Sequence, residues 1–325
     1  MSPFVSYDPE FAAVIGDEPR LERVVYTDAH EGPVYVAAED ALYVTTPPSP
    51  ISQIKRIALD GLRFPVEPER VTEVPAAVTM PNGMTLGPDG HLIVCEQGFL
   101  TEPARISQVD PRSGQTQSLV ENWHGRPFNS PNDVVVKSDG TIWFTDPSYG
   151  FLQGFRPPPL VGDYVYRYDP ASGRVSVVAD SFDKPNGLAF SPDEQILYVN
   201  DSGANQEPGS FHAGRPHHVL AFDVVGGRHL QNPRLLAVIA HGFPDGMKVD
   251  TDGRVYVSAT SGVLIFSAPG DLIGEIRVPD AVNFTFGGPD HNVLFITADT
   301  AVWVAVLQAT GAPGAAHTME RRVTV

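Results

Sequence analysis

The sequence has almost no cysteine and no long hydrophobic run. Cys95 is the only cysteine among 325 residues, so no internal disulfide can form. The first residues lack both the basic start and the continuous apolar stretch of a secretory signal, and no segment reads as a membrane span. These absences favour a cytoplasmic protein, unless a signal peptide was removed from a longer precursor.

Basic residues are also scarce. The chain has 22 Lys and Arg against 39 Asp and Glu, which gives a net charge of −17. This balance argues against nucleic acid or an anionic membrane surface as a partner, and it is compatible with binding a divalent cation. A sustained helical period is missing as well, whereas the apolar content of 42% is enough for a sizeable core.

What the chain does contain is a repeated phrase. Each copy starts with a residue carrying a side-chain oxygen, continues into a β-rich run, turns at a polar stretch containing Asp, and ends in a second β-rich run. The four clear copies are PNGMTLGPDGHLIVCEQG, PNDVVVKSDGTIWFTDPSYG, PNGLAFSPDEQILYVNDSG and PDGMKVDTDGRVYVSATSG. Two weaker copies are EGPVYVAAEDALYVTTP and VNFTFGGPDHNVLFITAD.

The copies recur roughly every 50 residues, a period typical of propeller blades. Six copies predict an all-β fold, a six-bladed β-propeller with a central metal site. We expect residues 1–20 to form an N-terminal extension, 21–310 the propeller, and 311–325 a C-terminal tail or closing strand. Insertions at 150–163 and 202–218 are candidate lids over the central site, or ordinary surface loops.

The oxygen-bearing residue of each copy predicts the metal site. In a propeller, the start of each innermost strand faces the central channel. Carboxylates and amides there form an all-oxygen set that suits Ca²⁺, argues against zinc, and suits Mg²⁺ less well. Alternatively, Asn and Asp serve only the turn geometry, but that does not explain why a Glu takes the same place. The residues are Glu31, Asn82, Asn132, Asn186 and Asp245, with Asn283 one residue out of register.

Together, these motifs resemble the senescence marker protein 30/gluconolactonase/luciferin-regenerating-enzyme-like family. The resemblance covers roughly residues 22–308, with the motifs in family order. It rests on HEGPVY from His30, NSPND from Asn129, WFTDPSYG from Trp143, PNGLAFSPD from Pro185 and PDGM from Pro244.

The family resemblance implies a six-bladed propeller that holds a divalent metal, usually Ca²⁺, and hydrolyses lactones. It places the metal on Glu31, Asn132, Asn186 and Asp245. Related paraoxonase-like propellers carry a catalytic His where this chain has Asn82. Animal gluconolactonases have an Arg where this chain has Ser130, so the resemblance is to the bacterial and fungal branch.

The leading hypothesis is therefore a metal-dependent lactonase acting on sugar lactones. The metal would polarise the lactone carbonyl, and a carboxylate would activate water. Asp245 is the first candidate for this base and Asp201 its rival. Both Asp201 and Asp146 end a strand, so each could instead make a structural hydrogen bond. Substrate contacts are expected from Asn82, Asp146, Tyr149 and Asn283.

Two alternatives stay open. The same metal could serve a hydrolase of non-sugar lactones or phosphotriesters, or the fold could be a non-catalytic, Ca²⁺-stabilised binding propeller. A sugar lactonase predicts a polar channel, and the other hydrolases predict an apolar one. The ion could also be Zn²⁺, Mn²⁺ or Mg²⁺. The expected partner is a small lactone, with no nucleic acid or membrane, and the oligomeric state is not predicted.

Overall fold

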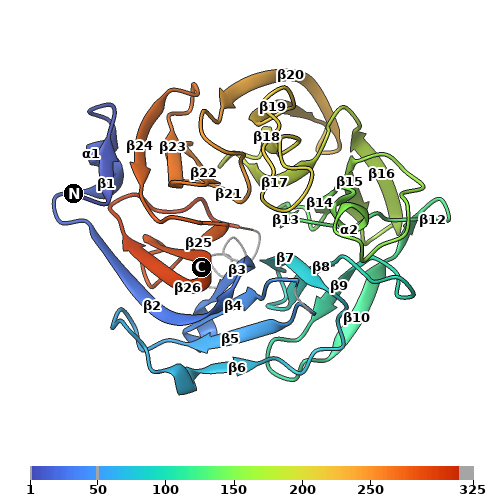
Figure 1. The fold of residues 1–325 in the computed structure, drawn as a ribbon, viewed down its shortest axis with the longest axis horizontal. Coiled ribbons are helices and arrows are strands. Elements are labelled where there is room, and N and C mark those ends of the chain that lie inside the picture. Colours follow the sequence, from blue (N-terminus) through green and yellow to red (C-terminus); the bar gives the residue numbers. More distant parts are fainter. Residues whose placement is uncertain (1, 49–50, 315–325) are drawn as a thin grey trace.

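The strands form six antiparallel sheets arranged in a ring (Figure 1). This computed structural model describes residues 2–48 and 51–314. Around the ring, each innermost strand contacts the innermost strand of the next sheet, and the last contacts the first. The predicted six-bladed β-propeller is confirmed.

Each of the first four blades takes its strands in chain order from the channel outward. The first two blades are β3 (Glu31–Val36), β4 (Ala41–Thr45), β5 (Ile54–Ala58), β6 (Val71–Glu73); and β7 (Pro81–Leu86), β8 (Leu92–Glu96), β9 (Arg105–Val109), β10 (Thr116–Val120). The next two are β13 (Val134–Val136), β14 (Ile142–Asp146), β15 (Tyr164–Asp169), β16 (Arg174–Ala179); and β17 (Pro185–Phe190), β18 (Ile196–Asp201), β19 (His218–Val225), β20 (His229–Val238).

The fifth and sixth blades recruit strands from the N-terminus. The fifth has β21 (Met247–Val249), β22 (Val255–Ala259), β23 (Gly262–Phe266), β24 (Leu272–Ile276) and then β1 (Phe4–Ser6); the sixth has β25 (Asn283–Gly287), the long β26 (Val293–Val306) and then β2 (Arg20–Ala29). The remaining elements are the hairpin β11 (Asn122–Trp123) and β12 (Arg126–Pro127), the helices α1 (Phe11–Ile15) and α2 (Tyr149–Leu152), and the 3₁₀ turns η1 (Ala37–Glu39) and η2 (Pro68–Arg70).

The core lies between the blades. Among the described residues, six clusters of buried hydrophobic side chains form, and each joins two neighbouring blades. A blade is therefore covered on both faces, which explains why second strands such as ALYVT in β4 and LIVCE in β8 are buried along their whole length. Cys95 belongs to the cluster between the second and third blades, and burial raises the pKa of its thiol.

The N-terminal residues belong to the propeller. β2 pairs with β26 and closes the ring, while β1 pairs with β24. From α1, Phe11 and Val14 are fully buried in the cluster between the fifth and sixth blades. Residues 4–15 of the expected N-terminal extension thus pack against the fifth and sixth blades, because their apolar side chains cover the edges of these blades. The closing strand comes from the N-terminus; of the expected C-terminal segment, Gly311 forms a β-bridge with Asp250, and 315–325 lie outside the described residues. No helix in the described part of the chain is long and apolar enough to cross a membrane.

Candidate functional site

Five of the predicted oxygen donors line one cavity of about 590 Å³ at one end of the channel. Three of them lie at irregularities in strand pairing. The register shifts by one residue between Glu31 and Val34, between Pro81 and Met84, and between Pro185 and Leu188. Such bulges turn a side chain out of the regular alternation of a strand. The five donors are Glu31, Asn82, Asn132, Asn186 and Asp245.

Glycine allows the neighbouring donor segments to approach one another. A Cβ on Gly83 would lie 2.3 Å from the Asn132 carbonyl oxygen, and one on Gly187 would lie 2.2 Å from the Asp245 carbonyl oxygen. The same glycines donate their backbone N–H groups to these oxygens, at 2.7 and 3.1 Å. Glycine therefore follows Asn in the repeat because another donor backbone occupies the place of its side chain.

The site brings together the carboxylates of Glu31, which is buried, and Asp245, which is half-buried. Burial raises the pKa of Asp245 well above its usual value, and the charge of Glu31 adds to the effect. The interaction of the Asp245 side chain with Glu31 raises this pKa further, while its interaction with Asn186 lowers it. Two adjacent carboxyl groups with little solvent around them repel each other when both are ionised, so that either a shared proton or a bound cation is needed to offset the repulsion.

The remaining side chains fit a hard divalent cation. Asn132 Oδ1 is buried and has no hydrogen-bond partner among the described residues, as expected of an oxygen facing an ion. Asn283 donates its amide N–H to Glu31 Oε2 at 2.7 Å and accepts from the Phe284 N–H at 2.7 Å. Asn283 thus lies outside the cavity lining and contacts the Glu31 carboxylate.

No group of three His, Cys, Asp or Glu side chains in 2–48 and 51–314 could hold a metal. Only Glu31 and Asp245 of the proposed ligands are ionisable, so the set depends on amide oxygens. The set is therefore not marked by clustered acids or histidines, whereas the sequence repeat predicts it.

The strand-end acids Asp146 and Asp201 do not line the cavity. Asp146 accepts the N–H groups of Asn129 and Ser130, at 2.9 and 2.8 Å, in the segment before Asn132. Asp201 accepts those of Asp183 and Lys184, both at 2.9 Å, before Asn186. Burial raises the pKa of Asp146 to about 8, against these backbone hydrogen bonds.

Glu96 makes the equivalent contact in the second blade, where its Oε2 accepts the Thr79 N–H at 2.6 Å. The three acids therefore anchor the segments that carry the donor amides. This geometry favours the structural alternative over the predicted substrate and catalytic roles of Asp146 and Asp201.

Tyr149 and both insertions lie at the mouth of the cavity. Tyr149, at the start of α2, lines it with Gln153, and its hydroxyl donates to the Ser202 carbonyl at 3.3 Å. Residues 205–211 of the second insertion line it too. The insertions are thus placed where the sequence suggested lids.

Sequence reasoning missed a His–Asp pair at the same mouth. His30 Nδ1 lies 2.6 Å from Asp299 Oδ1, and both residues line the cavity. Burial acts to lower the His30 pKa, but the hydrogen bond to Asp299 and the charge of Glu31 outweigh it and raise the pKa. The position of His30 directly before Glu31 was the available signal.

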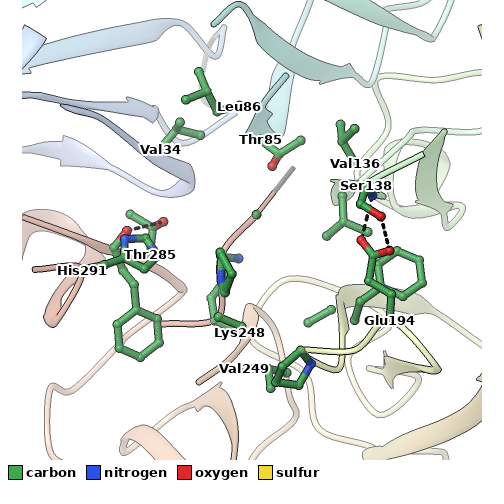
Figure 2. Close-up of a pocket in the computed structure, with 18 of the residues that line it drawn as sticks. Val34, Thr85, Leu86, Val136, Ser138, Glu194, Lys248, Val249, Thr285 and His291 are labelled. Carbon is green, nitrogen blue, oxygen red and sulfur yellow. Dashed lines mark hydrogen bonds between the residues drawn. The ribbon is translucent and has the colours of Figure 1, made fainter. Parts of the chain in front are cut away.

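A second cavity, of about 450 Å³, opens at the other end of the channel (Figure 2). It is lined by the far halves of the inner strands, including Val34, Leu86 and Val136, and by Lys248. Burial raises the pKa of Asp133 to about 6, and the nearby charge of Lys248 opposes this rise. Lys248 thus adds a positive charge to the channel below the acids of the first cavity.

Comparison with known proteins shows the family. The model of the SMP-30/gluconolactonase/LRE-like region matches residues 29–300. The chain belongs to this family. Within it, the chain is 32% identical over 278 residues to a gluconolactonase of Zymomonas mobilis subsp. mobilis, covering 83% of this chain and 76% of the relative.

Two further members of the SMP-30/gluconolactonase/LRE-like family support the same relationship. A lactonohydrolase of Aspergillus oryzae, oryL, is 27% identical over 315 residues, covering 87% of this chain and 69% of the relative. The structure of a gluconolactonase from Xanthomonas campestris superposes with a TM-score of 0.76 at 30% identity, covering 94% of this chain and 95% of that one. These relatives support a lactone-hydrolysing enzyme.

Proposed function

We propose that the protein hydrolyses lactones with a divalent cation, preferentially Ca²⁺, held by Glu31, Asn132, Asn186 and Asp245. The observation that carries this proposal is the pair of interacting carboxylates of Glu31 and Asp245, beside the unpartnered Asn132 oxygen, in one open cavity. A scaffold with no ligand at its axis has no need of such a pair. The lactonase relatives support the same reaction.

The reaction needs a base, a means of polarising the carbonyl and a proton for the ring oxygen. When bound, the cation would act as a Lewis acid toward the lactone carbonyl oxygen. Asp245 accepts a proton from the attacking water. The water oxygen bonds to the carbonyl carbon, the bond from this carbon to the ring oxygen breaks, and the ring oxygen takes the proton to become a hydroxyl.

The other residues position these groups. Asn82 faces the cavity with an amide that can both donate to and accept from a substrate oxygen. Asn283 holds Glu31, while Asp146 and Asp201 hold the segments of Asn132 and Asn186. We assign Asp245 as the catalytic base and the two strand-end acids as positioning residues.

D-glucono-1,5-lactone is the first substrate to test, because Gln97, Gln153 and Asn82 give one side of the cavity a polar lining. Acid release is followed in a pH-stat with chelated enzyme and again after Ca²⁺ is returned, with spontaneous hydrolysis subtracted. We expect activity to disappear on chelation, to return with Ca²⁺, and to fall at least a hundredfold in Asp245→Ala, as typical for loss of a general base.

Asp223→Ala is the matched control, because Asp223 is an exposed acid on β19 that pairs with Arg234. It should keep wild-type activity. If metal-loaded wild-type enzyme leaves every lactone tested at the background rate, the proposal is wrong, and the non-catalytic binding propeller becomes the better hypothesis.

A further inference from the structure

The lining of the metal-end cavity is divided into a polar and an apolar side. The apolar side comes from the fourth and fifth blades and from the segment that leads into the sixth; these blades are neighbours in the ring (Figure 1). Phe243 comes directly before Pro244 and Asp245, so the apolar side begins beside the proposed catalytic base. Besides Asp245, the polar residues on this side are Thr260, Asp280 and four residues of the loop that carries Phe211, namely Asn205, Gln206, Glu207 and Ser210. Its apolar members are Phe211, Phe243, Ala259, Ala281 and Val282.

From this division we infer that the enzyme acts best on a lactone whose ring carries an apolar substituent, alkyl or aryl. This inference rests on the proposed function and deepens it. The lactone carbonyl lies at Asp245, the ring oxygens face the amides of the first three blades, and the substituent lies against Phe211 and Phe243. The sequence predicts a sugar lactone as substrate. The inference replaces it with a lactone that has both polar ring oxygens and an apolar substituent.

Hydrogen bonds within its own loop fix the position of Phe211. The Ala204 N–H donates to the Pro216 carbonyl at 2.7 Å, and the His212 N–H donates to the Ala204 carbonyl at 2.8 Å. Ser210 Oγ accepts the N–H groups of Gln206 and Glu207, at 3.1 and 2.9 Å. The apolar side of the cavity, which we also call the apolar wall, is therefore formed before a substrate binds.

The polar side chains of this loop are mostly engaged elsewhere. Gln206 Nε2 donates to the Gly203 carbonyl at 2.6 Å, and Glu207 Oε2 lies 3.0 Å from His212 Nε2. Asn205 Oδ1 is buried without a partner among the described residues and offers one acceptor to the substrate. Phe211 remains 47% exposed although its loop is fixed.

An exposed aromatic ring over a binding cavity favours an apolar ligand. Covering it with hydrocarbon removes apolar surface from water, which stabilises the complex. A sugar hydroxyl in the same place would lose water without gaining a hydrogen bond from Phe211 or Phe243. The wall thus discriminates between the two kinds of substituent.

The test uses Ca²⁺-loaded enzyme and δ-valerolactones with methyl, propyl and pentyl groups on the carbon next to the ring oxygen, beside D-glucono-1,5-lactone. We expect kcat/KM to rise up to about fourfold per added methylene, the factor that corresponds to about 0.8 kcal/mol. Phe211→Ala should flatten this rise, whereas Phe211→Leu should largely keep it. Phe151→Ala is the control, since Phe151 is 43% exposed on α2 but does not line the cavity.

The outcomes separate the inference from the proposed function. No hydrolysis of any lactone by metal-loaded, folded enzyme overturns both. Hydrolysis of D-glucono-1,5-lactone with no rise along the alkyl series overturns the inference and leaves the lactonase in place. A rise unchanged in Phe211→Ala, with thermal melting like that of the wild type, also overturns it, because the wall would not be the source of the preference.

Discussion

Single buried acids determine where the donor amides lie. Glu96, Asp146 and Asp201 are each at most 1% exposed, and each accepts backbone N–H groups from the segment before the Asn of its own blade. A carboxylate whose oxygens accept backbone N–H groups in this way is not oriented toward a substrate. The sequence predicted that Asp146 and Asp201 end a strand, but it could not show which way their oxygens face.

Asp201→Asn tests this positioning role. The amide keeps one acceptor oxygen and turns a donor toward the N–H groups of Asp183 or Lys184, which should lower the free energy of unfolding by about 1–3 kcal/mol. Metal affinity should fall because the Asn186 segment loses its anchor, while kcat at saturating metal and lactone stays near wild type. Denaturation, metal titration and steady-state kinetics measure the three effects.

The exposed Asp223→Asn should change none of these quantities. A fall in kcat of a hundredfold or more at saturating metal would instead restore Asp201 as the catalytic base.

The charge of Lys248 gives a second prediction at this scale. Because burial raises the pKa of Asp133 to about 6, ionisation of this acid destabilises the fold as pH rises from about 4 to 6. Lys248→Met removes the opposing charge and raises this pKa further, so the destabilisation continues to higher pH. The variant should therefore lose more stability at pH 8 than at pH 5.

Chemical denaturation of metal-free protein across this pH range measures the difference, and Lys248→Arg, which keeps the charge, is the control. Equal losses at both pH values would mean that Lys248 contributes through packing alone.

The individual strand ends are shaped by close backbone contacts between blades. At Gly187 the Asp245 carbonyl oxygen lies where a Cβ would project, 2.2 Å away. Gly187→Ala must separate the fourth and fifth blades at Asn186 and Asp245, the proposed metal ligands of these blades. We expect a loss of about 1–3 kcal/mol in unfolding free energy, as for overpacking elsewhere, together with weaker metal binding.

Gly214→Ala is the control for Gly187→Ala, because no atom lies within 4 Å of the Cβ position at Gly214. Thermal melting with and without metal separates the two losses. Wild-type melting and metal affinity in Gly187→Ala would show that the inner strands shift at little cost.

Regular parts of the elements could be predicted from the sequence, and their irregular parts could not. PNGLAFSPDEQILYVND predicts two strands and a turn, and β17 and β18 follow it. Asn82, Asn132 and Asn186 were predicted together because their repeat position is the same. Asn283 was one residue out of register, and it contacts the Glu31 carboxylate. Its place depends on a contact between the sixth and first blades, which no local pattern records.

At the scale of the whole molecule, the ring closes through non-local pairing. The repeat predicted six blades but also suggested a separate N-terminal extension, because residues 1–20 carry no copy of the phrase. The closure by β2 on β26 and the addition of β1 to β24 join segments far apart in the sequence. The strand with which an N-terminal segment pairs depends on which blade edges remain uncovered once the six blades have formed.

Phe11→Ala tests whether the N-terminal segment belongs to the cooperative fold. Phe11 is fully buried against Gly274, where a Cβ would lie 2.1 Å from its ring. Truncating such a side chain typically lowers the free energy of unfolding by about 3–5 kcal/mol. Because its cluster spans the fifth and sixth blades, this loss should appear in a single unfolding transition of the whole propeller. Tyr7→Ala, a change of an exposed aromatic residue in the same segment, should cost far less. Denaturation followed by both circular dichroism and tryptophan fluorescence would detect a separate early transition, the result expected if residues 1–20 were an independent extension.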